Sequence, residues 1–511
     1  MPTELKIMRI KSLIVCLLLL VSGVFAALPN YTVVWEVRTV GSDTNGGGFV
    51  TGSTGTDMSQ FDNKNAAGCS SCQSATVNIS TTDAVAAGTT TITTATGNIS
   101  SALVGNIILL SGGSGSLTAA WYQVVTVVGA TSFTVDRTVS AGTGITMNIG
   151  GALATIQQMS TNMALSAGPG AWVKATANYG LSSTVTLSNG GPNTGFSFIN
   201  GYTTTRGDNG MATVIGLAGI AGGNSPLLQF SNSPFGMKLQ NFILDCDNRN
   251  FTRGLRFNTA NETAQNVIVQ NCSDLSFSFD QPSMCLECTT FNTPSSTAAG
   301  SSQLNFQNNN VYVVCIDCQA LGSTVNNAIA FNNTAGGYYQ GLVVSNFTGT
   351  GAIGVSIGTM EDHSLTIINS SFYNITSDAI KYNEGTVDTR PLLFRNIAIS
   401  NIGGYCINSI GAVTVNAAQN LSDYIACNTT GALGFYNNFP AGAHDITLTT
   451  SPFTNGASND FSLNNTAGGG AGLKQTGFPG VISAGTGYIS FGALEPQNTG
   501  GGSSTHASGT R

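Results

Sequence analysis

The chain carries very little charge. Only 8% of its 511 residues are Asp, Glu, Lys or Arg, it has three histidines, and its formal net charge is −7. Binding of nucleic acid needs a basic face that neutralises phosphates, so this composition argues against a nucleic-acid partner. The surface must instead be covered by Ser, Thr, Asn and many of the 64 glycines. A solenoid of short strands tolerates such a surface, because most of its turns can be neutral and hydrogen-bonded.

Long apolar runs are also lacking, apart from one near the N-terminus. Basic residues at positions 6–11 precede an apolar run from Leu13 to Val21, and Val24-Phe25-Ala26 supplies a small-x-small cleavage site. The run is too short to span a bilayer comfortably, and this arrangement is typical of a secretory signal peptide. We therefore expect the mature chain to be secreted or displayed at the cell surface, and to contain no transmembrane segment.

One short pattern is abundant between Pro226 and Phe439. An aliphatic residue, any residue and a second large apolar residue recur at steps of 20 to 29 residues. Apolar positions two apart indicate strand rather than helix. Units of about 25 residues with Asn, Gly and Ser in their turns are typical of coils that stack on their neighbours. The copies are Leu228–Phe230, Leu255–Phe257, Leu275–Phe277, Leu304–Phe306, Ile329–Phe331, Ile353–Val355, Ile380–Tyr382 and Leu433–Phe435, with a weaker copy at Ile407–Ser409 that ends in a polar residue.

A second strand follows most of these copies after about a dozen residues. The sequence therefore predicts an all-β fold, a parallel β-helix in which each coil contributes more than one short strand. These second strands are Phe242–Leu244, Val267–Val269, Leu342–Val344, Leu365–Ile367 and Leu392–Phe394.

Several segments near the start of the coils resemble a known family. Gly168–Gly180, Ser183–Ser188 and Phe196–Asp208, with Val34–Arg38 and Gly41–Phe49, look like the entry coils of right-handed parallel β-helix proteins of the pectate-lyase-like superfamily. The resemblance covers residues 31 to about 440 and is greatest to uncharacterised secreted and phage-associated members. It implies the fold. The superfamily includes lyases, hydrolases, epimerases, adhesins and inert structural members, so it implies no single activity.

Residues 75–150 have a different texture. They contain five short strands separated by Gly-rich turns, which predicts a small inserted barrel or sandwich. Trp121 and Tyr122 are candidates for stacking on sugar rings, although buried aromatic residues more often fill a core. Apolar residues then recur at helical spacing over Gly151–Leu165, which predicts a helix that caps the first coil, because an open solenoid end exposes apolar core and unpaired backbone.

These observations divide the chain into six predicted parts. They are a signal peptide (1–26), an N-terminal strand and cap loop (27–74), the inserted β-rich module (75–150), the parallel β-helix (151–440), C-terminal closing strands (441–495) and a disordered Gly/Ser-rich tail (496–511).

Ten cysteines follow Cys16 of the predicted signal peptide. Disulfides persist in the oxidising setting of an exported chain. Two CxxC pairs also have the spacing of a four-thiolate zinc site. Thiols three apart on a strand are expected to point to opposite faces, which favours a ladder of buried thiols or disulfides between coils over zinc. The CxxC pairs are Cys285/Cys288 and Cys315/Cys318, and further candidate pairs are Cys69/Cys72 and Cys406/Cys427.

Clustered ionisable residues are candidates for chemistry in so charge-poor a chain. Asp378, Lys381, His363 and Arg395 belong to neighbouring coils and are the predicted catalytic residues if the protein is an enzyme. Enzymes of this fold that cut acidic polysaccharides need carboxylates or a bound Ca²⁺ and a base, whereas hydrolases need two carboxylates. No cofactor is predicted, and Ca²⁺ is the ion that such a site would take. The alternative is a set of solvated turns with weak ion pairs.

A second group, Asp245, Asp247 and Arg253, is a candidate carbohydrate-binding site together with Trp121 and Tyr122. The motifs of the superfamily's enzymes are missing or altered. The Asn-Thr-Asp, Asp-Asp and Gly-His-Gly of polygalacturonases do not occur, and residues 390–395 carry the residue types of a pectate-lyase motif at a different spacing.

We therefore expect a secreted or cell-surface β-helix protein, bacterial in style, that binds carbohydrate or serves as an adhesive or structural element. Its expected partner is a polysaccharide or a cell-surface glycan. The alternatives are a polysaccharide lyase or glycoside hydrolase of the same fold, and a phage tail-spike-like protein.

Overall fold

The computed structural model describes residues 32–62, 80–115, 117–188, 196–220, 225–231, 236–248, 252–273, 275–291, 304–308, 311–333, 336–358, 364–383, 391–410 and 421–474. The predicted signal peptide, Cys69, Cys72, His363 and the tail 496–511 lie outside these ranges. In the described part, no helix has the length and apolar character that a membrane span requires.

The chain forms two compact units. Unit 1 comprises Met1–Ala177, Leu187–Gly210 and Asn232–Met237, and unit 2 comprises Asn178–Thr186, Met211–Ser231 and Lys238–Arg511. Strands dominate both units, and the described residues contain a single α-helix. The predicted all-β class is confirmed.

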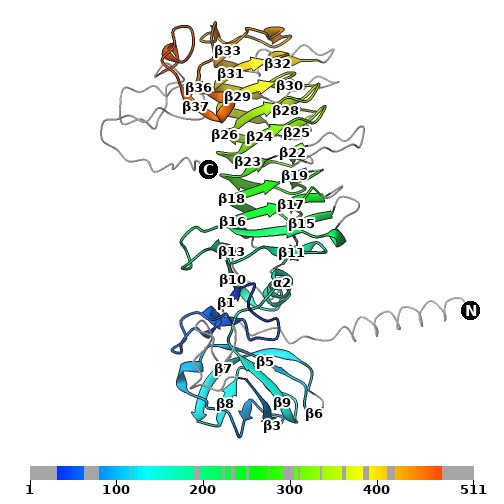
Figure 1. Cartoon of the computed structure of the whole chain (residues 1–511), viewed down its shortest axis with the longest axis vertical. Helices are drawn as coiled ribbons and strands as arrows, with labels where there is room; N and C mark the ends of the chain where they lie inside the picture. Colours follow the sequence, from blue (N-terminus) through cyan, green and yellow to red (C-terminus); the bar gives the residue numbers. More distant parts are fainter. Residues whose placement is uncertain are drawn as a thin grey trace, which may run out of the picture. The chain divides into compact units, whose positions relative to one another are not determined.

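Unit 1 contains a closed antiparallel barrel of six strands, coloured blue to cyan in Figure 1. The strands follow the order β3-β4-β8-β7-β5-β9, the pairing of β9 with β3 closes the barrel, and the short β6 extends it at β9. Fully buried residues such as Ile92, Phe133 and Ile145 fill it. The predicted inserted module is thus a barrel. Its strands are β3 (Ser80–Ala86), β4 (Thr91–Thr93), β5 (Ile107–Ser111), β6 (Ser114–Gly115), β7 (Ala120–Gly129), β8 (Ser132–Val135) and β9 (Gly142–Ile149).

Unit 1 also holds the first parallel strands and the helix. Strand β1 (Thr32–Val37) pairs in parallel with β10 (Ala167–Lys174), which pairs with β13 (Ser197–Tyr202), while β2 (Gly48–Val50) runs antiparallel to β1. Helix α2 (Ile156–Met163) begins after Thr155, whose hydroxyl caps it by accepting a hydrogen bond from a backbone N–H of the first turn. The apolar side of α2 is buried and the helix contacts β1 and β10, which confirms the predicted cap.

Unit 2 is a parallel β-helix, as predicted, whose strands stack in two sheets (Figure 1). The first, here called the long sheet, contains β11 (Tyr179–Leu181), β14 (Ala212–Gly216), β16 (Met237–Asp245), β18 (Glu262–Gln270), β20 (Ser283–Leu286), β21 (Thr289–Phe291), β23 (Val313–Ile316), β24 (Gln319–Ser323), β26 (Gly337–Gln340), β27 (Val343–Phe347), β29 (Leu365–Ile375), β31 (Leu392–Ile402), β33 (Leu421–Asn428) and β35 (Ile446–Leu448).

The second is a ten-stranded sheet formed by the repeated apolar pattern. Its strands are β12 (Val185–Leu187), β15 (Ser225–Phe230), β17 (Thr252–Phe257), β19 (Leu275–Phe279), β22 (Leu304–Asn308), β25 (Ile329–Asn333), β28 (Ile353–Ile357), β30 (Ile380–Tyr382), β32 (Tyr405–Ser409) and β34 (Gly434–Asn437).

Aromatic side chains stack along the interior of the ten-stranded sheet. The rings of Phe277, Phe306 and Phe331 occupy successive coils, with centroids 4.7 and 4.4 Å apart and planes nearly parallel. Phe257 and Phe279 stack in the same way at 4.5 Å. Parallel strands repeat at about 4.8 Å, so equivalent rings in neighbouring coils lie at contact distance.

The register of the repeats differs from the predicted alignment at three places. Leu255 pairs with Phe277 rather than Leu275. A two-residue slip also occurs between β28 and β30, where Val355 pairs with Ile380. Alternation with period two cannot distinguish registers that differ by two, because both point the same side chains inward. In the last repeat the predicted partner of Ile407 was Leu433, but Ile407 pairs with Tyr436, three residues later. Leu433 is instead 72% exposed.

Each coil turns a corner of the long sheet through a residue in the left-handed conformation, and these residues stack in register. We call them the turn column. Its amide side chains bond from coil to coil where they adjoin, as Asn266 does to Asn241 (2.7 Å) and Asn396 to Asn369 (2.8 Å). Asparagine and glycine adopt this conformation most readily. The column consists of Asn241, Asn266, Glu287, Asp317, Gly341, Asn369, Asn396 and Tyr424.

A hairpin near the C-terminus lies on the outside of the solenoid. Strands β36 (Phe453–Asn455) and β37 (Asp460–Leu463) pair only with each other among the described strands. Phe453 and Phe461 pack on outward residues of several coils, including Leu321 and Val343. Within the range predicted to hold the closing strands (441–495), β35 (Ile446–Leu448) pairs with β33, and β37 belongs to this C-terminal hairpin.

The aromatic stack leads to a prediction about stability. Phe331→Ala is expected to destabilise the protein by about 3–5 kcal/mol, because it removes a buried ring and leaves a cavity between two coils. Denaturant unfolding of the purified chain would measure it. The matched control is Asn332→Ala on the opposite face of the same strand, expected to stay within about 0.5 kcal/mol. If the two substitutions lowered the free energy of unfolding equally, the inward orientation of Phe331 would be contradicted.

Candidate functional site

The outer surface of the β-helix has three kinds of face. On three successive strands of the long sheet, β20, β23 and β26, the half-buried outward residues are largely apolar: Met284, Leu286, Val314, Ile316 and Tyr338, with Gln340 as the polar exception. We call this the apolar face. A second face carries the C-terminal hairpin. The third face, the outside of the ten-stranded sheet, is polar, so the three faces differ in the ligands they can accept.

A single column of polar residues runs along that third face. Nine positions follow one another in unbroken register, and seven of them are uncharged. We call this set the polar column. The parallel strands repeat it at about 4.8 Å per coil. Its members are Gln229, Arg256, Ser278, Gln307, Asn332, Ser356, Lys381, Asn408 and Asn437.

Hydrogen bonds already link some members of the polar column. Asn437 donates to Asn408 across one coil, at 2.9 Å, and Arg256 forms an ion pair with Asp280 at 2.6 Å. Six members are half-buried, among them Lys381, Asn332 and Ser356. These six members therefore present hydrogen-bond donors and acceptors that reach solvent, whereas Ser278 and Asn408 are buried.

Asp378 occupies a different environment from the one expected of a general base. Its carboxylate is buried, with 4% of the residue exposed. It accepts hydrogen bonds from the backbone N–H of Tyr405 and from Nδ2 of Asn408, both at 2.8 Å and both in the next coil. The geometry therefore gives Asp378 the role of joining two coils. Lys381 lies three residues later on the outside of β30.

Arg395 does not share a face with Lys381. It lies on β31 of the long sheet, whereas Lys381 lies on the ten-stranded sheet. In register next to Arg395 is Asp423 of β33. Asp423 contacts His444, whose Nδ1 lies 3.1 and 3.2 Å from the two carboxylate oxygens. The backbone N–H of His444 also donates to Asp423, at 3.0 Å.

The imidazole of His444 is held from a second side. It stacks on Tyr424 with ring centroids 4.5 Å apart and an angle of 12° between the planes. Its side chain is 57% exposed. Tyr424 has φ +57° at the end of the turn column, a conformation that is unfavourable for a bulky residue. Arg395, Asp423, Tyr424 and His444 are here called the histidine site; His444 is exposed, and the other three residues are half-buried.

The histidine site was only partly visible in the sequence. His444 had no partner nearby in the chain, because Asp423 lies 21 residues earlier. Only the pairing of β33 with β35 brings the two together. The sequence signal for this site was a charged residue just before the corner in each of two successive coils, Arg395 and Asp423.

The second predicted group forms a hydrogen-bonded corner. Asp245 accepts bonds from Gln270 Nε2 (2.8 Å), from Asn271 Nδ2 (2.9 Å) and from the backbone N–H of Asp247 (2.8 Å). Arg253 lies on β17, in the other sheet. Asp245 is therefore largely occupied by the next coil, and Asp247 is exposed.

The two aromatic candidates in the barrel have different surroundings. Tyr122 belongs to the barrel core and is 7% exposed. The guanidinium of Arg137 lies 4.1 Å from its ring centroid, and burial raises the pKa of Tyr122. Trp121 is half-buried and donates from Nε1 to the carbonyl of Asn45, at 3.3 Å. Of this pair, Trp121 alone presents ring surface to solvent.

A buried charge network in unit 1 escaped the sequence reasoning. Glu36 is fully buried, and both of its carboxylate oxygens have cationic partners: Arg38 at 2.8 Å and Arg206 at 2.7 Å. Tyr202 also donates to Glu36. Although burial alone would lower the pKa of Arg38, the neighbouring carboxylates Glu36 and Asp62 raise it above its usual value. Such a saturated network supports folding of this region rather than ligand binding.

The loop that carries Arg206 is held by Asp208. Its carboxylate accepts backbone N–H bonds from Thr203, Thr204 and Thr205, and these bonds lower the pKa of Asp208. The predicted N-terminal strand is β1, but nothing local to Glu36 indicated that a partner lies 170 residues away.

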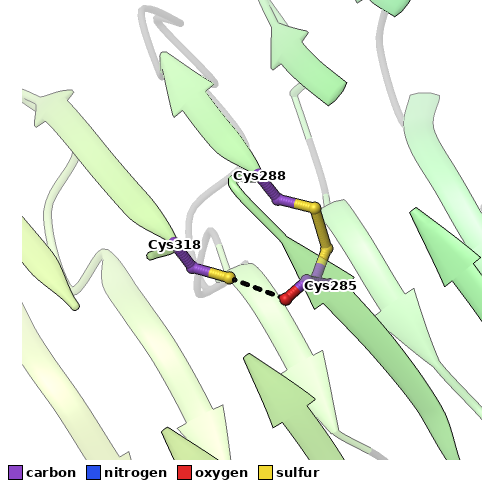
Figure 2. Close-up of side chains that lie close together, drawn as sticks. All are labelled: Cys285, Cys288 and Cys318. Atoms are coloured by element: carbon purple, nitrogen blue, oxygen red, sulfur yellow. Dashed lines mark hydrogen bonds between the residues drawn. A yellow bond between two sulfur atoms is a disulfide. The ribbon is translucent and has the colours of Figure 1, made fainter. Parts of the chain in front are cut away.

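Sulfur atoms form the one group of three or more potential metal ligands among the described residues (Figure 2). Cys285, Cys288 and Cys318 place their sulfurs within 4.8 Å of one another, and all three residues are buried. Ca²⁺ prefers oxygen ligands, so this group does not suit it. The Ca²⁺ expectation stays a prediction.

The prediction that CxxC thiols point to opposite faces is wrong. Cys285 and Cys288 are both fully buried and form a disulfide with a Cα–Cα distance of 5.8 Å. The reason is Glu287 of the turn column, which lies between them with φ +54°. This corner breaks the alternation of the strand and turns both side chains inward. Disulfides also join Cys246 to Cys272, in neighbouring coils, and Cys406 to Cys427, one of the predicted pairs.

Comparison with known proteins gives no family model and no curated protein that matches the chain. Solved structures with a similar fold include open reading frame 18 of Geobacillus virus E2, with 12% identity, a TM-score of 0.32 and coverage of 55% of this chain and 53% of that one. The chain thus matches about half the length of the viral protein.

Two further similar structures are an alginate lyase from Paenibacillus and a phage tailspike. The lyase has 10% identity, a TM-score of 0.32 and coverage of 57% of this chain and 94% of that one. The tailspike gp49 of Pseudomonas phage LKA1 has 12% identity, a TM-score of 0.22 and coverage of 75% and 67%. Similarities this low carry no argument about function.

The position of Asp378 leads to a prediction. Asp378→Asn is expected to lower stability by about 1–3 kcal/mol, because the new amide cannot accept both buried hydrogen bonds. The midpoint of denaturant unfolding would measure it, with Asp460→Asn in the exposed C-terminal hairpin as the matched control. Unchanged stability with a loss of glycan binding or cleavage would contradict the structural role.

Proposed function

We propose that the protein binds a polysaccharide or cell-surface glycan along the polar column. The observation that carries the proposal is the unbroken register of nine polar positions on one face of the β-helix. A linear glycan repeats its hydroxyl groups along its length. A column that repeats hydrogen-bonding side chains coil by coil matches such a ligand.

The other two faces of the β-helix are less suited to binding a glycan. Outward residues of the apolar face offer few hydrogen bonds to a sugar, and the C-terminal hairpin covers part of the second face. The seven uncharged members of the polar column suit a neutral or weakly acidic glycan. Lys381 supplies the positive charge that a carboxylate-bearing sugar would need, whereas the charge of Arg256 is already balanced by Asp280. We place this binding outside the cell, in line with the predicted signal peptide.

Lys381→Ala is expected to weaken retention on a bound polysaccharide about tenfold, since a hydrogen bond to a charged group is worth about 1.5–3 kcal/mol. Affinity electrophoresis of the purified chain in gels that contain acidic or neutral polysaccharides would measure it.

The matched control is Lys238→Ala on β16, which removes the same charge from the outside of the long sheet. Retention that both changes weaken equally would indicate general charge attraction and exclude the polar column. Ser356→Ala, in an uncharged member of the column, should also weaken binding while Lys238→Ala does not.

The histidine site supports a second candidate function, cleavage of an acidic polysaccharide. In the tautomer in which Nδ1 of His444 carries the proton and donates it in a hydrogen bond to Asp423, the lone pair is on Nε2, which is the arrangement of an oriented general base. The strained backbone of Tyr424, whose ring stacks on the imidazole, is a feature that clusters at functional sites.

The chemistry would be elimination beside a uronate carboxylate. Nε2 of His444 would take the proton from the carbon next to the carboxylate, the electron pair would form a carbon–carbon double bond, and the glycosidic oxygen would leave and take up a proton. Arg395 lies next to Asp423 in register and would balance the carboxylate of the sugar. Hydrolysis would instead need a second carboxylate at set separation.

If the site cleaves, His444→Gln is expected to lower the rate about 10²- to 10⁴-fold, the usual contribution of a general base. Absorbance of the new double bond and release of reducing ends would both be followed on a panel of uronate polymers. Tyr338→Phe, which removes a hydroxyl from the apolar face, is the control. Cleavage that persists in His444→Gln would exclude the histidine site, and retention without cleavage would leave binding alone.

A further inference from the structure

Four cysteines meet inside the β-helix where two coils are joined in register. Cys285 of β20 pairs with Cys315 of β23. The hydrogen bond from the N–H of Gln319 to the carbonyl of Cys288, at 2.8 Å, aligns the second cysteine of each pair in the same way. Two CxxC segments 30 residues apart in sequence are thus superimposed, one coil upon the next.

The second CxxC segment turns the same corner as the first. Asp317 lies between Cys315 and Cys318 with φ +56°, as Glu287 does between the first two cysteines with φ +54°. Both corners belong to the turn column. Cys315 and Cys318 are fully buried free thiols. Their backbone therefore repeats the geometry that brings Cys285 and Cys288 into a disulfide.

Figure 2 shows how close the coils lie at this point. The thiol of Cys318 donates a hydrogen bond to the carbonyl oxygen of Cys285, at 3.6 Å, directly beside the disulfide. Together with Cys315, which contacts Cys318 through its thiol, the four sulfurs form one cluster across two coils.

We propose that Cys315 and Cys318 are the site of a second disulfide, so that the mature protein carries two CxxC disulfides stacked on adjacent coils. The bond forms by transfer of two electrons and two protons to an oxidant of the disulfide class, such as a thiol oxidase of the export pathway. One thiolate attacks the oxidant's disulfide and forms a mixed disulfide. The partner thiolate then displaces the oxidant, which leaves with both of its sulfurs reduced.

The surroundings of the cluster favour disulfides over a metal. The residues at the matching positions of the preceding coil are Ala264 and Val267, and those of the following coil are Tyr339 and Leu342, all of them buried. Zinc held by four thiolates would carry two net negative charges, which such an apolar interior disfavours. A disulfide is neutral and small enough for the same space.

Burial also fixes when the bond must form. Desolvation raises the pKa of the Cys315 thiol, so the reactive thiolate is scarce once the coils have closed. Oxidation therefore belongs to the folding stage, before the coil that begins at Gly337 covers the site. Once formed, each disulfide holds its corner in place. It thereby stabilises the left-handed backbone conformation of the charged turn residue, which is otherwise unfavourable for such a residue.

The test is a thiol count on the full chain, purified after export through an oxidising compartment. The chain is unfolded in denaturant without reductant, treated with an alkylating reagent, digested between Cys288 and Cys315, and examined by mass spectrometry. We expect no alkylation at any of the four positions. The peptide that holds Cys315 and Cys318 should lack two hydrogen atoms and take up two alkyl groups only after reduction. The Cys246–Cys272 disulfide serves as the internal control.

Three results would overturn the proposal. They are alkylation of both Cys315 and Cys318 without reductant, a peptide cross-linked between the two coils, and one equivalent of zinc per chain with four thiols freed on its removal. The Cys318→Ala variant provides a further check on pairing. Cys315 should then become alkylatable while the Cys285–Cys288 peptide stays closed, and a Cys315 that remains blocked would show a different partner.

Discussion

The left-handed residue at one corner of each coil is the constraint on which the rest of this structure depends. It bends a strand that would otherwise continue flat, and its repetition in register lets the coils stack without loss of backbone pairing. The side-chain amide of Asn266 adds a hydrogen bond to that of Asn241 between neighbouring corners. The same bend explains why two cysteines three residues apart both reach the interior, and why Asp423 and Tyr424, at the corner of a late coil, are presented to His444.

The interior and exterior of the coils follow from that geometry. Apolar side chains alternate inward and stack ring on ring, as Phe306 and Phe331 do. The outward positions are then free to differ from face to face, and they do: apolar, covered or polar. Glycan binding and glycan cleavage are proposed for different faces, because the polar column belongs to the ten-stranded sheet and the histidine site to the long sheet.

The sequence predicted the coils, the cap helix and a small inserted barrel or sandwich, because strand alternation, helical spacing and turn residues are local signals. It misaligned Leu255 and Leu275, because a two-residue slip preserves the pattern of inward side chains. It could not show that Asp378 is buried by the next coil, or that Glu36 meets Arg206, since both depend on contacts that only the stacked coils create. The orientation of Cys285 and Cys288 was predicted wrongly because Glu287, between them, adopts a left-handed backbone conformation. Nothing in the sequence indicates that conformation for a glutamate.

The C-terminal hairpin changes how the solenoid is expected to unfold. In a stack where each coil touches only its neighbours, the end coil can peel away first and the others can follow one by one. Here Phe453 and Phe461 pack on a surface shared by several coils, and Asn459 accepts a hydrogen bond from Ser345 at 2.7 Å. The C-terminal hairpin therefore links the last coils to one another. These coils are expected to unfold together, as one cooperative unit, rather than one by one from the end.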